Sequence, residues 1–274
     1  MIQKVEMTVL IDNVAAEPLV GEWGLSIFIA ADDRRILLDT GASGLFAQNA
    51  ERLGIDLDSV DAGVLSHAHY DHADGLDAFF AANRNAPFLV REGAGENCFG
   101  VKEGTLRYIG IRGGILRAHA ARIRYVRGVY EVANGIWLVP HRRADYSSIA
   151  LRSDLYVVDG GVRRPDDFAH EQSLVVETER GLIVWNSCSH AGMTNILADI
   201  REMLGRDDVY AYVGGLHLYK LTDGELGALC GELRRTRIRH ILTGHCTGDH
   251  AFGFLKAELG GRIAQFSSGF RYSF

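Results

Sequence analysis

The sequence predicts a mixed α/β fold with four layers, αββα, in which helices cover two packed β-sheets. Three observations lead to this fold class. Apolar strands come early in each half of the chain, and segments with helical periodicity follow them. No repeat and no linker divides the chain. The 274 residues, 47% of them hydrophobic, can bury a large core. We therefore expect one domain over residues 1–274, with an insertion around residues 93–150.

In the first half, residues 4–11 alternate between apolar and polar side chains, which is typical of a half-buried strand. The polar turn at residues 31–34 joins two apolar runs. A segment with helical spacing starts at Leu45 and ends at Gly54, a residue that commonly terminates helices. The other elements expected here are strands at 25–30, 35–39, 62–66 and 87–91 and a helix at 75–83.

In the second half, two short apolar runs at residues 173–177 and 181–186 predict a β-hairpin. Residues 93–150 are rich in Gly and Arg and have mixed periodicity, so only a strand at 136–139 is assigned there. The remaining predicted elements are helices at 193–204, 223–235 and 251–259 and strands at 209–213 and 240–243.

Composition excludes several classes of protein. The net charge of −6 and pI near 6.0 are unlike those of a general nucleic-acid binder. The start has no signal-peptide pattern, and no apolar stretch is long enough for a spanning helix. Four cysteines without a CxxC pair indicate a reduced, cytoplasmic protein. Cys98 and Cys230 are expected to be small buried hydrophobes, whereas Cys188 and Cys246 lie beside histidines.

The strongest chemical signal follows the predicted strand at 62–66. His67, His69, Asp71 and His72 lie within six residues, and imidazole and carboxylate groups are ligands for zinc and other first-row metals. In an extended or turning segment, His67 and His69 can point to the same side. Asp71 and His72, one turn further on, can then face a second point nearby. This geometry suits two adjacent metal ions.

The motif resembles the HxHxDH signature of the metallo-β-lactamase superfamily. The segments 37–41 and 241–245 resemble the superfamily's Asp-Thr-Gly turn and its last metal-binding histidine. Within the superfamily, the sequence motifs most resemble those of the 7,8-dihydropterin ribofuranosylaminobenzene phosphate synthase-like branch of metal-dependent hydrolases. Four segments carry that closer resemblance: Glu171-Gln172-Ser173-Leu174, Ser187-Cys188-Ser189-His190-Ala191-Gly192, Gly214-Gly215-Leu216-His217-Leu218 and Gly244-His245-Cys246-Thr247-Gly248.

The resemblance implies that His67 and His69 hold a first metal ion, and that Asp71, His72 and His245 hold a second. His190 is a further candidate ligand, because it follows an apolar strand and faces the same kind of strand-end cleft. Asp39 is expected to support a ligand histidine through its other ring nitrogen.

The chain departs from the common superfamily pattern at two places. Residues 170–172 stand where most members have a third histidine, and residues 187–190 replace a bridging aspartate. The sequence leaves open whether His190, His170 or Glu171 supplies the missing ligand, and whether one metal ion or two bind.

Two further features have competing interpretations. His217, after two glycines, is a metal ligand, a substrate contact or a core histidine. The arginines of the middle segment form a solvated face, or they line the cleft and bind phosphate. These arginines are Arg112, Arg117, Arg122, Arg124, Arg127, Arg142 and Arg143. The histidines at 119, 141, 240 and 250 have no converging partners and are expected to be incidental.

The sequence therefore predicts a hydrolase that uses one or two zinc ions and a metal-activated water on a small, phosphate-containing molecule. Asp71 is the catalytic candidate, as a ligand, a water-orienting group or a proton shuttle. Iron and manganese are alternatives to zinc. The alternative functions are a pterin-related synthase that displaces pyrophosphate and a non-catalytic metal or ligand sensor. No nucleic-acid or membrane partner is expected, and the oligomeric state is open.

Overall fold

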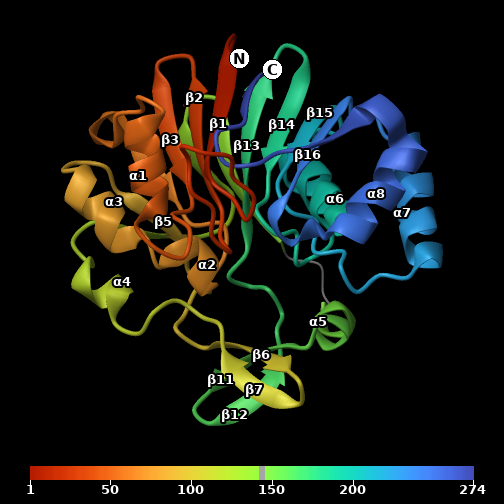
Figure 1. Cartoon of the computed structure of the whole chain (residues 1–274), viewed down its shortest axis with the longest axis horizontal. Helices are drawn as coiled ribbons and strands as arrows, with labels where there is room; N and C mark the ends of the chain where they lie inside the picture. Colours follow the sequence, from red (N-terminus) through yellow and green to blue (C-terminus); the bar gives the residue numbers. More distant parts are fainter. Residues whose placement is uncertain (142–145) are drawn as a thin grey trace.

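Apolar side chains from two β-sheets meet in the centre of the molecule and form its inner core. The computed structural model describes residues 1–141 and 146–274, and within them each of these two sheets has seven strands (Figure 1). Val9 and Ile27 of the first sheet pack in one buried cluster with Ile183 and Val213 of the second. Alternation of side chains along each strand sends these residues inward and their neighbours toward the helices.

The first sheet combines the start, the end and the middle of the chain. Its outer strand β18 pairs antiparallel with β1, with Met7 opposite Tyr272. The strands from β3 to β8 run parallel, so their carboxyl ends lie at one edge of the sheet. In spatial order the strands are β18 (Arg271–Ser273), β1 (Val5–Ile11), β2 (Ser26–Ala31), β3 (Arg34–Leu38), β4 (Ala62–Val64), β5 (Phe88–Arg91) and β8 (Ile123–Val126).

The second sheet contains the predicted hairpin and four parallel strands. β13 and β14 pair antiparallel, with Val175 opposite Val184. From β14 to β17 the strands are parallel and end at a common edge. In spatial order the strands are β17 (Ile263–Gln265), β16 (His240–Thr243), β15 (Val209–Val213), β14 (Gly181–Trp185), β13 (Gln172–Thr178), β10 (Ile136–Pro140) and β9 (Tyr130–Ala133).

Helices cover the outer face of each sheet, which completes the predicted αββα layering (Figure 1). The helices beside the first sheet are α1 (Leu45–Arg52), α2 (Tyr70–Ala73), α3 (Leu76–Ala82) and α4 (Ile115–Ala118). Those beside the second are α6 (Met193–Leu204), α7 (Asp223–Arg235) and α8 (Asp249–Leu259), whereas α5 (Ser147–Ser153) lies lower and contacts residues 155–159 and 162–165. Short 3₁₀ helices occupy Leu57–Ser59, His245–Thr247 and Gly260–Arg262.

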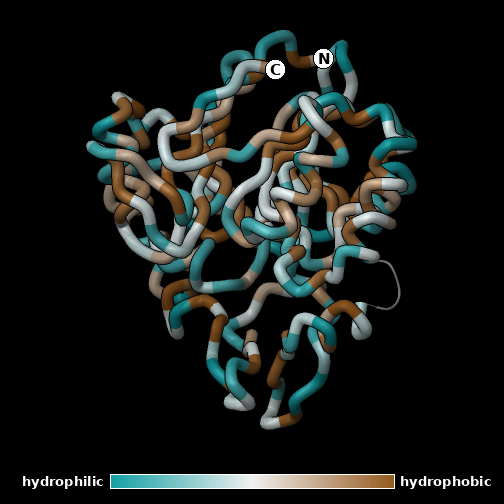
Figure 2. The backbone as a smooth tube through the Cα atoms, turned by 45° about the vertical axis from the view of Figure 1, so that its right-hand side comes forward, coloured by the Kyte–Doolittle hydropathy of each residue, from teal (hydrophilic) through white to brown (hydrophobic). Residues whose placement is uncertain are grey.

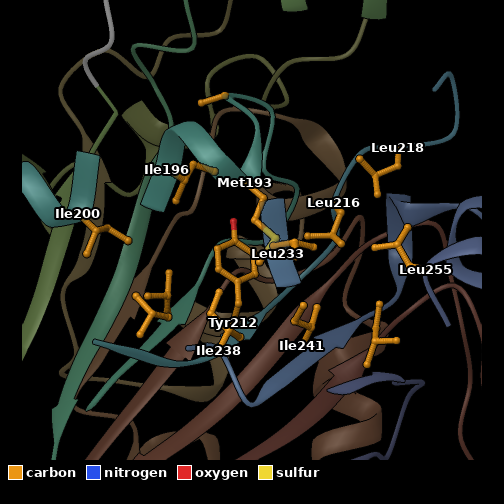
Figure 3. Packing of buried hydrophobic residues seen from close by; sticks show 14 of the residues in the cluster. Met193, Ile196, Ile200, Tyr212, Leu216, Leu218, Leu233, Ile238, Ile241 and Leu255 are labelled. Carbon is orange, nitrogen blue, oxygen red and sulfur yellow. The ribbon is translucent and has the colours of Figure 1, made fainter. Parts of the chain in front are cut away.

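The outer core of the second sheet centres on Tyr212 of β15. Figure 3 shows Met193 of α6, Leu233 of α7 and Leu255 of α8 packed around it. The Tyr212 hydroxyl reaches Ser189 Oγ at 2.8 Å, and Ser189 precedes His190. The packed helices therefore also hold the loop that carries a predicted metal ligand.

A small third sheet lies below the two large ones (Figure 1). Its four described strands, in spatial order, are β12 (Val162–Pro165), β11 (Leu155–Asp159), β6 (Cys98–Lys102) and β7 (Thr105–Tyr108). Residues 93–150 thus supply two strands to this sheet, and they supply β8, β9 and β10 to the large sheets. The inserted unit around 93–150 stays a prediction.

Hydropathy follows the layers. Figure 2 shows hydrophobic stretches concentrated along the central strands, with hydrophilic segments in the outer turns. None of the helices in the described part of the chain has both the length and the apolar character that crossing a membrane requires.

Candidate metal centre

Polar loops at the carboxyl ends of strands from both large sheets meet at one site. His67 follows β4 of the first sheet, whereas His190 and His245 follow β14 and β16 of the second. The sheet edges that carry these strand ends face each other, so residues distant in sequence become neighbours. All six side chains predicted as ligands are buried here: His67, His69, Asp71, His72, His190 and His245.

Three of these histidines form a first triad. One potential ligand atom from each of His67, His69 and His190 lies within 4.8 Å of the others. The Nε2 atoms of His67 and His190 are 3.2 Å apart. The triad joins the two halves of the sandwich, because His190 comes from the second sheet.

Asp71, His72 and His245 form a second triad with the same spacing limit of 4.8 Å. The Nε2 atoms of His72 and His245 are 3.2 Å apart. Asp71 Oδ2 lies 3.4 Å from His245 Nε2 and 3.7 Å from His72 Nε2. α2, a single helical turn that the sequence did not predict, places Asp71 and His72 beside each other.

The outer ring nitrogens of His67 and His72 are held by Ser66 and Asp39. Asp39 Oδ2 lies 2.8 Å from His72 Nδ1 and accepts the Ser66 hydroxyl at 2.7 Å. Because that hydroxyl proton goes to Asp39, Ser66 Oγ accepts from His67 Nδ1 at 2.8 Å. The Nε2 atoms of His67 and His72 therefore present lone pairs to the site. Asp39 lies where the sequence placed it, as a support for a candidate ligand.

Two residues at the end of β1, which the sequence analysis missed, hold His245. Asp12 Oδ1 accepts the His245 backbone N–H at 2.9 Å, and Asn13 Oδ1 lies 3.0 Å from His245 Nδ1. They follow a predicted strand, as His67 does. Their position at a strand end is the signal that could have found them.

The electrostatics of the site suit bound cations. Burial lowers the pKa of His67 and His190 well below its usual value and that of His69 to about 3, so these rings are neutral near pH 7. Within the described residues, His69 Nε2 and His190 Nδ1 are buried without a hydrogen-bond partner. Inward lone pairs and unpartnered buried nitrogens are expected of a site whose remaining partner is a metal ion.

Two cysteines add sulfur donors that the sequence analysis had not assigned to the site. Cys188 Sγ lies 3.3 Å from His72 Nε2. It also belongs to two close groups of potential ligands, one with His67 and His72 and another with His245 and Cys246. Cys188 therefore lies between the two triads, where residues 187–190 replace the bridging aspartate.

His217 borders the site but belongs to neither triad. Its ring centroid is 4.4 Å from that of His190, and both of its ring nitrogens are buried without a partner among the described residues. The preceding Gly215 makes room for another loop: a Cβ there would lie 2.5 Å from Cys246 Sγ. The two glycines thus allow the strand-end loops to pack together.

His170 and Glu171 make contacts other than those of the triads. His170 pairs with Asp166 at 3.0 Å, and Glu171 accepts the backbone N–H groups of His190 and Ala191. The four histidines expected to be incidental have partners elsewhere. His119 contacts Asp77, His141 contacts Ser173, His240 contacts Tyr210 and Tyr272, and His250 contacts Asp223.

A cavity of about 610 Å³ opens over the triads. The small sheet forms one wall, and Lys102 and Arg107 line it from the β6–β7 hairpin. Trp23, Tyr219 and Lys220 also border it, and Lys220 pairs with Asp154 at 2.7 Å. Small molecules can thus reach the candidate ligands from one side.

The arginines singled out in the sequence do not line this cavity where they are described. Arg112 pairs with Asp77 and Arg127 with Glu92 on the surface. Arg122 donates to the carbonyl groups of Asn83 and Ala86. Arg117 and Arg124 are also absent from the cavity wall, and Arg142 and Arg143 lie outside the described residues. Lys102 and Arg107 supply the positive charge instead, and no charge run marks them.

Comparisons with known proteins agree with the fold and the site. One relative, from Methanocaldococcus jannaschii, is a 7,8-dihydropterin-6-methyl-4-(beta-D-ribofuranosyl)-aminobenzene-5'-phosphate synthase. It is 28% identical over 259 residues, which cover 88% of this chain and 86% of the relative. A solved metal-dependent hydrolase of the beta-lactamase superfamily superposes with a TM-score of 0.82 at 29% identity, covering 98% of both chains.

A diphosphatase of the PhnP family has the same fold, with a TM-score of 0.56 at 14% identity and coverage of 98% of both chains. The family model for the metallo-beta-lactamase superfamily matches residues 24–171. That range is more than half of the chain, and it contains Asp39 and four of the six candidate ligands, which are His67, His69, Asp71 and His72. The chain belongs to the metallo-beta-lactamase superfamily.

Proposed function

We propose that the protein is a metal-dependent hydrolase that acts on a small, phosphate-containing molecule. The observation behind this proposal is that both triads contribute to the lining of a cavity with a basic wall. The first triad contributes His69 and His190, and the second contributes Asp71 and His245. When bound, a divalent metal ion lowers the pKa of a water molecule toward neutrality and so supplies a nucleophile. Zinc suits the nitrogen, oxygen and sulfur donors, with iron and manganese as alternatives.

The residues divide the task between binding metal and binding substrate. His67, His69 and His190 would hold one ion, and Asp71, His72 and His245 the other. The carboxylate of Asp71 is kept ionised: burial opposes ionisation, but the neighbouring His72 and His245 lower its pKa. An ionised Asp71 can therefore bind a cation or accept a proton from a nearby water.

The cavity wall supports an anionic substrate. Lys102 and Arg107 project from adjacent strands, where Arg107 stands opposite Gly100 and Lys102 opposite Thr105, so both lie on one face of the hairpin. Within the described residues neither forms a salt bridge, which leaves their charge available. Guanidinium and ammonium groups bind phosphate oxygens well. His217, with both ring nitrogens unpartnered within the described chain, would contact the same substrate.

The test is hydrolysis of generic phosphomonoesters, phosphodiesters and lactones by the purified protein. We expect turnover of phosphate esters that chelation abolishes and added zinc, iron or manganese restores. His190→Ala and His245→Ala should each reduce turnover, while His250→Ala, at an exposed histidine that pairs with Asp223, should not. Turnover that persists after complete metal removal would contradict the proposal. Tight metal binding without any turnover would favour a sensor.

A pterin-related synthase that displaces pyrophosphate is the second candidate, because the M. jannaschii relative is named as a dihydropterin-containing phosphate synthase and aligns over most of this chain. The same basic wall would serve its phosphate-bearing substrates. The distinguishing measurement is pyrophosphate release. A synthase would release pyrophosphate only when both of its substrates are present, whereas a hydrolase needs one ester and water.

A further inference from the structure

The segment 166–172, between β12 and β13, touches both halves of the first triad without belonging to either triad. Below it is called the clasp segment. Its residues Asp166, Phe168, His170, Glu171 and Gln172 are all buried. Such burial of charged and polar groups is costly unless each has a specific partner. The partners of these groups lie in the two loops that carry the first triad.

On the first-sheet side, the clasp segment holds the backbone between two candidate ligands. Asp166 Oδ2 lies 3.0 Å from His170 Nε2, and a carboxylate only accepts, so this nitrogen carries the hydrogen. The Ala68 N–H donates to His170 Nδ1 at 3.2 Å, so this second nitrogen presents its lone pair to the backbone. Ala68 stands between His67 and His69. The Asp166–His170 pair therefore fixes the peptide from which both histidines project.

Gln172 strengthens the same side. Its backbone N–H donates to the Ser66 carbonyl at 2.8 Å, and its side-chain amide donates to the Leu65 carbonyl at 2.8 Å. The clasp segment is therefore hydrogen-bonded to Leu65 and Ser66, just after β4, as well as to Ala68. Because Ser66 also accepts from His67, the ring and the backbone of the first ligand are tied to one framework.

On the second-sheet side, Glu171 holds the loop of the third ligand. Its Oε1 accepts the His190 N–H at 2.8 Å, and its Oε2 accepts the Ala191 N–H at 2.9 Å. The Phe168 ring stacks on the His190 ring, with centroids 5.4 Å apart and planes 17° apart. Both the backbone and the ring of His190 are thus located by neighbouring residues of the clasp segment.

We infer that Asp166, His170 and Glu171 are positioning residues that set the first triad across the two halves of the sandwich. The inference deepens the proposed function, because it concerns the same site. His67 and His69 lie in the loop after β4 of the first sheet, and His190 lies in the loop after β14 of the second. The distance between these ligands therefore depends on how the two loops are joined. Ligand groups must be held to within about 0.5 Å for tight binding, and the clasp segment hydrogen-bonds to both of these loops.

A different use of the same residues is disfavoured by the hydrogen bonds. His69, Cys98, Asp166 and His170 form a group whose potential ligand atoms lie within 4.8 Å of one another. A metal there would need the lone pair of His170 Nε2, and Nδ1 would then carry the hydrogen. Because Nδ1 faces the donor N–H of Ala68, that tautomer would set two N–H groups against each other. The group is therefore a hydrogen-bonded support of the triad.

The experiment measures metal affinity by competition with a chelator, in full-length protein with one triad at a time. His245→Ala leaves the first triad intact, and His190→Ala leaves the second. We expect Glu171→Gln and His170→Ala to weaken zinc binding about 10- to 100-fold in the His245→Ala background. In the His190→Ala background the same changes should leave zinc affinity within about twofold. His170→Asn, which can still accept from Ala68, should recover part of the loss.

The control is Asn83→Ala, which removes a buried side chain bonded to the carbonyl groups of Leu57 and Val60, away from the triads. It should lower stability without changing zinc affinity in either background. Equal weakening of both triads, or unchanged affinity in folded clasp variants, would overturn the inference. The inference would also be overturned if His170→Ala lost a bound metal ion that neither triad holds. Since affinity is read without turnover, a failure of the proposed hydrolysis would leave this test interpretable.

Discussion

The Nε2 atoms of His72 and His245 lie 3.2 Å apart, although one residue follows a strand of the first sheet and the other a strand of the second. Asp39 and Asn13 hold the opposite ring nitrogens of the two histidines. The rings are thus aimed at a shared point by residues from the first sheet. Metal bound at this point would bridge the two halves of the sandwich and couple site occupancy to folding.

Removal of metal is expected to lower the thermal unfolding midpoint. A ligand that binds only the folded state at 100 times its Kd adds about 2.7 kcal/mol to stability. The measurement is thermal unfolding before chelation, after chelation and after zinc is restored. The shift should be smaller in His190→Ala, which lacks one ligand of the first triad. An unchanged midpoint would contradict tight binding.

The two triads should respond differently to pH. Burial opposes protonation of His245, but the hydrogen bond with Asp71 and the nearby Cys246 and Asp12 together outweigh it and raise the pKa of His245 from 6.5 to about 9. Metal must therefore displace a proton from His245 at neutral pH, and affinity at the second triad should rise as pH approaches 9. Zinc affinity at the first triad should not change over this pH range, because the pKa of His69 is about 3 and those of His67 and His190 are also lowered.

The measurement is zinc affinity between pH 6.5 and 9 in His190→Ala and in His245→Ala. Equal slopes in the two variants would contradict the assignment. In the metal-free protein the pH dependence has the opposite sign, and it concerns stability instead of zinc affinity. The folded pKa of His245 exceeds the unfolded value, so its stabilising contribution is present below about pH 6.5 and is lost as pH rises through about 9. Denaturant unfolding of the metal-free protein at both pH values tests this.

Asp39→Ala should weaken metal binding about 10- to 100-fold, because it leaves His72 Nδ1 and the Ser66 hydroxyl without their acceptor. It should also lower the free energy of unfolding by about 1–3 kcal/mol through these unsatisfied buried groups. Chelator competition and denaturant unfolding measure the two effects. Asp33→Ala, at an exposed aspartate of the same sheet, is the matched control and should change neither.

Lys102→Ala and Arg107→Ala should raise KM for a phosphorylated substrate about tenfold, with little change in kcat, because the contacts bind substrate away from the reacting atoms. Arg163→Ala is the control: it removes an arginine of the same small sheet that lies over Tyr156 and outside the cavity. Steady-state kinetics on one phosphate ester and on one uncharged lactone separate the cases. An equal loss on both substrates would argue against phosphate recognition.

Gly215→Ala should destabilise the fold by about 1–3 kcal/mol, because the added Cβ would meet Cys246 Sγ at 2.5 Å and the Ser187 carbonyl at 2.8 Å. Gly231→Ala has open space on α7 and should stabilise the protein by roughly 0.5–1 kcal/mol through helix propensity. Denaturant unfolding of both variants checks the pair. If the two variants changed the free energy of unfolding by similar amounts, the close packing around Gly215 would be contradicted.

The sequence predicted the layers because strand and helix periodicity are local properties. It also brought His67, His69, Asp71 and His72 together, since they lie within six residues. α2 and the small sheet were missed. α2 is only four residues long, and two strands of the small sheet, β7 and β12, are mostly exposed and so have no alternating burial to impose a pattern.

The sequence by itself determined the superfamily motif, the αββα layering and the kind of chemistry that the histidines can support. Only the tertiary structure decided which distant groups meet. His170 and Glu171 were open candidates for a ligand, yet their side chains turn to Asp166 and to the backbone of His190. The reason is physical: spacing along the chain sets neighbours within one turn or strand. Contact between residues 100 positions apart depends on how two sheets pack and on which buried polar groups must find partners.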